Sequence, residues 1–204
     1  DNDKLIRTPL ICIVGPPRVG STILYQSVIN RLDVDYFTNL EYMFYRYPNT
    51  IFYLNRILSK LKKYNSTGTS AIGFESGLFS PSEFSRFWED FFNYSLNDPR
   101  RSQNILPVSH AISALNKRWE SIQKPLVTSW NPHVFYYEDI IRKFQNVLFV
   151  VMIREPIEIA RSIYHGRILS NENLDEWWSY IPKSCIGCTS SYQQIACQTA
   201  SFLK

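Results

Sequence analysis

The sequence predicts a single α/β domain over residues 1–204, with a parallel β-sheet flanked by helices. Short apolar runs alternate with segments of helical period, which is the pattern of strand–helix–strand units. A glycine-bounded loop joins the first apolar run to a helix. The 204 residues suffice for one well-buried core but are too few for two ordinary domains.

Three apolar runs are predicted to be buried parallel strands. Leu10–Val14 lies between Pro9 and Gly15, Pro125–Ser129 is short, and Val147–Ile153 is apolar throughout. Continuous apolar runs, rather than alternating ones, are typical of strands that are covered on both faces of a sheet. We therefore expect helices on both sides of all three strands.

Six segments carry apolar residues at helical spacing or show a helix start. The best-marked start is at Ser80, where Pro81 would occupy the first helical position and Glu83 the third. The predicted helices are Ser21–Leu32, Thr50–Tyr64, Ser80–Tyr94, Ser109–Gln123, His133–Gln145 and Glu155–Ile168.

Composition and charge narrow the classes of function. The net charge of +4 suits an anionic ligand, but no block of Lys and Arg follows one face, so nucleic-acid binding is not expected. No apolar stretch approaches the roughly 20 residues of a membrane span, and residues 1–4 do not resemble a signal peptide. We expect a cytoplasmic protein, or a protein of the Golgi lumen if an anchor has been removed.

The four cysteines are expected to form no disulfide framework. Cys12 falls within an apolar strand, Cys185 and Cys188 form a lone CxxC pair, and Cys197 is single. A structural zinc site normally needs a second pair of ligands, so no metal site is predicted.

The loop after the first strand reads Gly15-x-x-x-x-Gly20-Ser21-Thr22. A strand that enters a helix through such a loop points backbone N–H groups and the positive end of the helix dipole at one spot, which binds anions. ATP-hydrolysing proteins carry Lys at the position of Ser21, so this loop disfavours ATP chemistry. Arg18 can hold a terminal anionic group instead. The alternative is a plain strand–turn–helix corner.

A second motif follows the last predicted strand. Arg154 ends the apolar run, and Ser162 lies two turns into a helix that Pro156 can start. The two side chains lie close together if that helix packs back on the strand end. The alternative is that Arg154 merely forms an ion pair with Glu158.

Together the two motifs resemble those of sulfotransferases that use 3′-phosphoadenosine 5′-phosphosulfate (PAPS), and the resemblance extends from about Leu10 to Ala200. It implies a P-loop-NTPase-like sulfotransferase fold, PAPS as co-substrate and no metal. In that family the loop binds the 5′-phosphosulfate, and the strand-end Arg and helix Ser bind the 3′-phosphate. The implied donor-binding residues are Pro17, Arg18, Val19, Gly20, Ser21, Thr22, Arg154 and Ser162.

Three features depart from the family pattern. Val19 stands where Ser is usual, and Trp130 stands where relatives often carry Lys before an Asn-Pro pair. Related enzymes also continue beyond the position of Lys204, so we expect the C-terminal part of the domain to be missing.

Sulfuryl transfer is an in-line displacement with demands similar to those of phosphoryl transfer. Arg18 is predicted to stabilise charge on the bridging oxygen, and a carboxylate or imidazole must remove the acceptor's proton. Relatives often place a Glu about twenty residues after the loop arginine, which points to Glu41; Glu75 and His110 are further candidates. Glu41 and His110 could instead be solvent-exposed residues near helix starts.

The predicted function is transfer of a sulfuryl group from PAPS to a hydroxyl or amine of an unidentified acceptor, either a small molecule or a carbohydrate. The aromatic-rich segments Tyr36–Tyr53 and Phe74–Trp88 either line an acceptor pocket or form a core. Two alternatives stay open: a non-catalytic nucleotide-binding member of the family, and a P-loop nucleotide kinase. The sequence gives nothing on oligomeric state.

Overall fold

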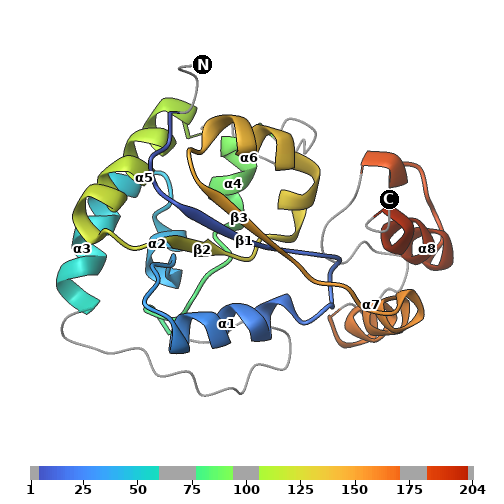
Figure 1. Cartoon of the computed structure of the whole chain (residues 1–204). Coiled ribbons are helices and arrows are strands. Elements are labelled where there is room, and N and C mark those ends of the chain that lie inside the picture. The colour runs from blue at the N-terminus through green and yellow to red at the C-terminus, as the bar shows by residue number, and fades with distance from the viewer. Residues whose placement is uncertain (1–4, 60–76, 94–105, 171–182, 202–204) are drawn as a thin grey trace.

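The structure is a computed structural model that describes residues 5–59, 77–93, 106–170 and 183–201. Its centre is a three-stranded parallel sheet in which β1 (Leu10–Val14) lies between β2 (Leu126–Thr128) and β3 (Val147–Val151). Helices flank the sheet, as Figure 1 shows, so the predicted α/β class is confirmed. Asp35 adds one further parallel bridge, to Leu126 on the outer side of β2.

Side chains of β1 alternate between the two faces of the sheet, as the pleat requires. Leu10, Cys12 and Val14 belong to the larger core cluster, which includes residues of the helices on one face. Ile13 belongs to a second cluster with Tyr25, on the face that α1 (Ser21–Arg31) covers. The central strand is therefore buried from both sides.

All three predicted strands exist, but the third ends at Val151 rather than Ile153 and is less buried than expected. Leu148 is 57% exposed and Val151 is 63% exposed. The physical reason is position, because β3 pairs with β1 on one side and forms the edge of the described sheet. An apolar run by itself does not distinguish a central strand from an edge strand.

Each of the six predicted helices has a counterpart in the structure, although some bounds differ. The structure adds two that the sequence did not indicate, a short one after Thr38 and one near the C-terminus. After α1, the helices and 3₁₀ turns of the described residues are α2 (Asn39–Met43), α3 (Pro48–Ser59), α4 (Ser85–Phe91), α5 (Val108–Ile122), η2 (Asn131–Tyr136), α6 (Tyr137–Lys143), α7 (Pro156–Ser170), η3 (Lys183–Cys185) and α8 (Ser191–Ser201).

Two predicted helices need correction. The predicted start at Ser80 is wrong: Pro81 forms an antiparallel bridge with Thr38, and the Ser82 N–H donates to the Phe37 carbonyl. Because this pairing holds the segment extended, α4 begins only at Ser85. The predicted helix over 133–145 divides into η2 and α6 and ends at Lys143. The ends of the predicted helices at 60–64 and 94 lie outside the described residues.

Aromatic side chains form the core on the α4 side of the sheet. Phe37 stacks on Phe84 with ring centroids 4.0 Å apart, and Trp88 meets the His133 ring edge-on at 4.8 Å. Burial without a hydrogen-bond partner for either ring nitrogen lowers the pKa of His133 to about 3, so this histidine is neutral. Of the two interpretations of the aromatic-rich segments, an acceptor pocket or a core, the structure supports a core for Phe37, Phe84 and Trp88.

Arg118 of α5 is the centre of a buried ion cluster. It pairs with Asp35 and with Glu41, and its Nη2 donates to the Tyr36 carbonyl at 2.6 Å. The guanidinium also lies over the Phe37 ring, 4.8 Å from its centroid. Burial disfavours the charged guanidinium, but the two carboxylates outweigh this effect and raise the pKa of Arg118. One side chain thus joins α5, α2 and the segment beside β2.

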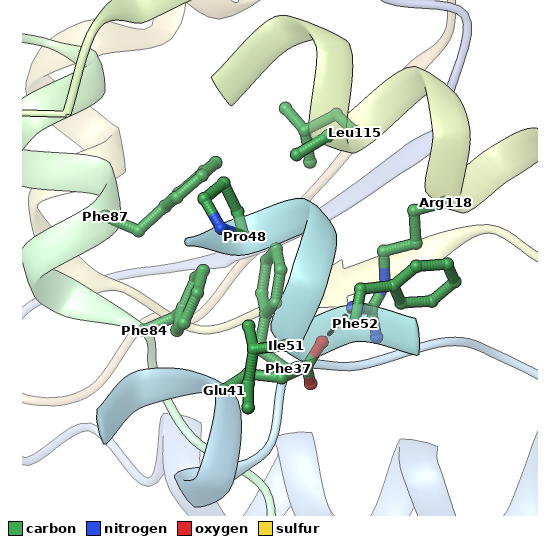
Figure 2. A pocket seen from close by; sticks show the side chains of 10 residues that line it. Phe37, Glu41, Pro48, Ile51, Phe52, Phe84, Phe87, Leu115 and Arg118 are labelled. Atoms are coloured by element: carbon green, nitrogen blue, oxygen red, sulfur yellow. Dashed lines mark hydrogen bonds and ion pairs between the residues drawn. The ribbon is translucent and has the colours of Figure 1, made fainter. Parts of the chain in front are cut away.

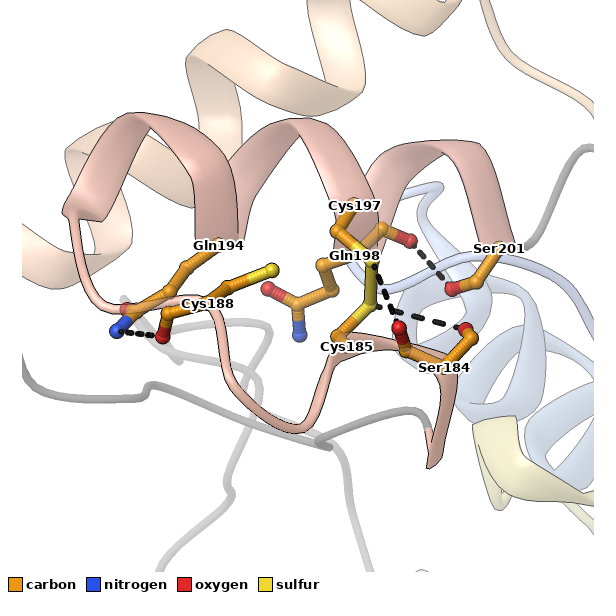
Figure 3. Close-up of a disulfide and its surroundings, with 7 residues drawn as sticks. All are labelled: Ser184, Cys185, Cys188, Gln194, Cys197, Gln198 and Ser201. Carbon is orange, nitrogen blue, oxygen red and sulfur yellow. Dashed lines mark hydrogen bonds between the residues drawn. A yellow bond between two sulfur atoms is a disulfide. The ribbon is translucent and has the colours of Figure 1, made fainter.

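A disulfide between Cys185 and Cys197 corrects the expectation that the cysteines form no framework. Figure 3 shows the bond joining η3 to α8, with Cys188 outside it as a free thiol. The Gln194 amide of α8 accepts a hydrogen bond from buried Arg167 of α7 at 2.7 Å. The sequence missed the pair because the two cysteines meet only when the chain between them turns back into α8.

We expect Arg118→Ala to lower the free energy of unfolding by about 3–5 kcal/mol, because it leaves two buried carboxylates without their cation. Urea unfolding at pH 7 measures the change. Arg142→Ala is the matched control, since Arg142 is exposed and pairs with surface carboxylates; it should change stability by less than about 1 kcal/mol. Equal effects of the two substitutions would contradict the assigned role of Arg118.

We expect Cys185→Ser to lower stability by about 3 kcal/mol, the value for a loop of this size, because the two bonded cysteines are 12 residues apart. Cys188→Ser should leave stability unchanged because Cys188 takes no part in the bond. Thermal unfolding of both variants, with and without a reductant, checks this. A wild type whose melting temperature does not respond to the reductant would show that the bond does not contribute.

Candidate functional site

The loop between β1 and α1 is compact and closely packed. Gly15 is required by its neighbours, because a Cβ there would lie 2.8 Å from the Met152 carbonyl oxygen. Gly20 adopts φ +100°, a conformation that side chains rarely allow. Val19 is 8% exposed and close to Gly15, so the residue that replaces the usual Ser packs inward.

The N-terminus of α1 is open toward the loop. Gly20 provides no side-chain cap, and Leu24 makes the first helical hydrogen bond, to the Gly20 carbonyl. The N–H groups of the first turn therefore have no acceptor within the helix, and the turn has no acidic residue. The Ser21 hydroxyl donates to the Asn131 side-chain oxygen at 3.3 Å, which connects the loop to η2. Such an end favours an anion.

The two sequence motifs meet at this loop. Arg18 Nε donates to the Ser162 hydroxyl at 3.0 Å, and Arg154 Nη1 donates to the Arg18 carbonyl at 2.9 Å. These contacts join residues 144 and 136 positions apart. Both arginines and Ser162 thus lie together beside the start of α1.

Strand pairing explains why the motifs meet. β1 and β3 are parallel neighbours with Val14 opposite Val151, so their carboxyl ends lie at the same edge of the sheet. Arg18 follows one end and Arg154 follows the other. The alternative for Arg154 is also present, since its Nη2 lies 3.6 Å from Glu158. The two interactions use different guanidinium nitrogens and are compatible.

Glu41, the first candidate base, lies at a helix start as expected, but it is buried rather than solvent-exposed. Its Oε2 accepts from the Thr38 N–H at 2.9 Å and from Asn55 Nδ2 at 3.1 Å, while its Oε1 pairs with Arg118. Burial raises the pKa of Glu41, and Arg118 opposes that rise. Its carboxylate is engaged in the ion cluster, so its role as a base stays a prediction that this arrangement does not favour.

Of the other two candidate bases the structure describes only His110, and it does not bring this residue to the loop. His110 is exposed in the first turn of α5, on the sheet face opposite α1, so the solvated alternative is the one observed. Glu75 lies outside the described residues. Trp130 is 3% exposed and stacks in parallel with Phe92. It belongs to the core.

A pocket lies between α2, α3 and α5, with aromatic walls and the ion cluster at one side (Figure 2). Phe37, Phe84 and Phe52 line it, together with Glu41 and Arg118. Its cavity volume is about 10 Å³, about that of one water molecule. A pocket of this size does not accommodate an acceptor.

Sequence reasoning missed Glu83, which it treated only as a helix-start residue. Glu83 is half-buried, and loss of solvent raises the pKa of its carboxyl to about 7. No pattern in the sequence could have identified it, because its ionisation depends on what the fold packs around it.

Within the described residues, no group of three or more His, Cys, Asp or Glu gathers as a metal site would require. The described helices include none that is long and apolar enough to cross a bilayer.

The raised pKa of Glu83 predicts a pH dependence of stability. The folded protein holds this proton more tightly than the unfolded chain, whose carboxyl has its ordinary pKa of 4.5. The stability of the wild type relative to Glu83→Gln should therefore fall as the pH rises from 4.5 to about 7. The expected fall is about 1–3 kcal/mol. Urea unfolding of both proteins across that range measures it, and a constant difference would contradict the shift.

Comparisons with known proteins give one similar structure. No family model matches the chain, and no curated protein sequence matches it. A crystal structure of sulfotransferase STF9 from Mycobacterium avium is similar with a TM-score of 0.46 and 13% sequence identity, over 80% of this chain and 48% of that one. The chain thus spans about half the length of that protein. A similarity of this size says nothing about activity.

Proposed function

We propose that this chain contains the donor site of a PAPS-dependent sulfotransferase, within a single domain. The reaction would move a sulfuryl group to a hydroxyl or amine of a small-molecule or carbohydrate acceptor. The observation that supports this most directly is the contact of Arg18 with Ser162 and Arg154 beside the open end of α1. The loop and the start of α1 would bind one anionic group of the ligand. Arg154 and Ser162 would bind a second one.

The residues present fit the two anionic ends of PAPS. The free N–H groups of the first turn of α1, with Ser21 and Thr22, suit the 5′-phosphosulfate. Ser162 and Arg154 suit the 3′-phosphate, because the hydroxyl and the guanidinium both donate hydrogen bonds. Arg18 lies between the two sets through its contacts with Ser162 and Arg154.

The protein would contribute to the reaction mainly by positioning the substrates and by stabilising negative charge. PAPS supplies the activated sulfuryl group when it is bound. The Arg18 guanidinium and the end of α1 place positive charge where the bridging oxygen becomes negative. Ser21 is held by Asn131, so its hydroxyl has a set position at the helix start. These groups take the place of the loop Lys of P-loop nucleotide kinases.

A non-catalytic, nucleotide-binding protein is the second candidate. Two observations favour it: Glu41 is engaged in the buried ion cluster, and Trp130 replaces the Lys of sulfotransferases with a core side chain.

The disulfide between Cys185 and Cys197 favours the lumenal location over the cytoplasmic one, because disulfides form mostly in oxidising compartments.

Thermal unfolding with 3′-phosphoadenosine 5′-phosphate, the product nucleotide, tests the donor site. At 100 times its dissociation constant the nucleotide should stabilise the wild type by about 2.7 kcal/mol, which raises the melting temperature by roughly 5–10 °C. The double substitution Arg18→Ala with Arg154→Ala should abolish this rise, because it removes both guanidinium groups.

The control is Arg7→Ala with Arg142→Ala, which removes the same charge from two exposed positions and should leave the nucleotide effect intact. Stabilisation by ATP with magnesium but not by the product nucleotide would refute the proposed donor. Survival of the effect in the Arg18 and Arg154 double variant would mean that the phosphates bind elsewhere.

A further inference from the structure

Glu83 differs from the other buried carboxylates of the described structure. Asp35 and Glu41 pair with Arg118, and Asp90 accepts a hydrogen bond from the Leu106 N–H at 3.0 Å. Within the described residues, the half-buried Glu83 side chain has no ion-pair or hydrogen-bond partner. Removing a carboxylate from water without a partner is unfavourable, and such groups are concentrated at functional sites.

The backbone on both sides of Glu83 is held firmly. The Ser82 N–H donates to the Phe37 carbonyl at 2.8 Å, and the Ser82 hydroxyl accepts from the Phe84 N–H at 3.2 Å. Phe84 adopts φ 54° and is 1% exposed against the aromatic core. Because both neighbours are anchored inward, the Glu83 side chain has a defined place at the surface of this core.

This place lies against α1, the helix that follows the loop. Tyr25 follows Ser21 by one helical turn, so both lie on the same face of α1. Its hydroxyl donates to the Ser82 carbonyl at 3.2 Å. Burial and, after it, the Glu83 carboxylate raise the pKa of Tyr25, so the two side chains interact electrostatically. Glu83 therefore lies along the face of α1 whose first turn carries Ser21.

We propose that Glu83 is a catalytic residue of the transfer reaction and takes the proton from the acceptor's hydroxyl or amine. The inference rests on the proposed function, and it assigns to a residue that the sequence analysis passed over the role for which Glu41 was the first candidate. Its geometric support is the unpaired, half-buried carboxylate, the anchored Ser82 and Phe84, and the contact of that segment with α1.

The step conserves atoms and charge. The Glu83 carboxylate accepts the proton as the acceptor oxygen or nitrogen forms its bond to sulfur. The bond between sulfur and the bridging oxygen breaks, and its electron pair leaves on the 5′-phosphate of the nucleotide. Arg18 stabilises that charge. No oxidant, reductant or further co-reactant is needed.

The ionisation of Glu83 suits this role. Its raised pKa, about 7, lets the carboxylate accept a proton near neutral pH and release it again. Tyr25 from α1 is the titratable side chain that interacts with it, and Tyr25 stays neutral because its pKa is raised. Asp35, Tyr36 and Arg118 also act electrostatically on Tyr25. Burial raises the pKa of Tyr36 to about 12, and the two carboxylates that pair with Arg118 raise its pKa, so Tyr36 stays neutral and Arg118 stays charged near pH 7.

The test measures release of 3′-phosphoadenosine 5′-phosphate from PAPS, with water as the acceptor, against a protein-free blank. The wild-type rate should rise with pH with a midpoint near 7. Glu83→Gln should lower the rate about 100-fold or more and flatten the profile, because it cannot accept the proton. Its affinity for the product nucleotide, measured by calorimetry, should change less than about 2-fold, since Glu83 is assigned to the acceptor side.

The matched control is Glu120→Gln, which neutralises an exposed carboxylate on α5 and should leave rate and affinity unchanged. If Glu83→Gln binds the product nucleotide and releases it from PAPS at the wild-type rate, Glu83 does not have the proposed role, and the donor site is unaffected. Product binding by a wild type that does not exceed the blank also overturns the role of Glu83. A wild type that binds no product nucleotide refutes the proposed function itself, and the role of Glu83 falls with it.

Discussion

The parallel pairing of β1 with β3 is the constraint on which the rest of this molecule depends. Five residues of β1 stand opposite five of β3, from Leu10 opposite Val147 to Val14 opposite Val151. Because parallel strands end at the same edge, the loop after one and the arginine after the other must lie side by side. The contact between Arg18 and Ser162 follows from this register, since α7 starts directly after the strand-end segment. A shift of one residue would turn Leu10, Cys12 and Val14 away from the larger core cluster.

The buried ion cluster holds the other half of the molecule to this sheet. Arg118 reaches from α5 across the aromatic core to Asp35, which is bridged to β2. Phe37, two residues further, lies under the guanidinium and stacks on Phe84. The same short segment thus connects the sheet, the cluster and the turn that carries Glu83.

Glu41 and Glu83 are two glutamates that the fold places in different electrostatic environments. Glu41 is 1% exposed and has donors on both oxygens, so the charge serves the fold. Loss of solvent raises the pKa of Glu83 to about 7, and the described residues include no such donor to its carboxylate. A carboxyl that is stabilised by a cation is a poor proton acceptor, whereas one with a pKa near 7 is a suitable one. Distance from the loop arginine in sequence does not distinguish the two cases.

The sequence by itself determined the α/β class, the three strands and the glycine-bounded loop between the first strand and its helix, because these depend on local patterns: continuous apolar runs and paired glycines. It did not determine where α4 begins, since pairing of Ser82 with Phe37 overrides the local helix signal at Ser80. Only the tertiary structure decided that Cys185 meets Cys197, that Glu41 is buried against Arg118 and that Glu83, next to a residue that contacts α1, has no partner among the described residues. Each of these outcomes depends on contacts between distant segments and on lost solvent, and neither is encoded in the spacing of neighbouring residues.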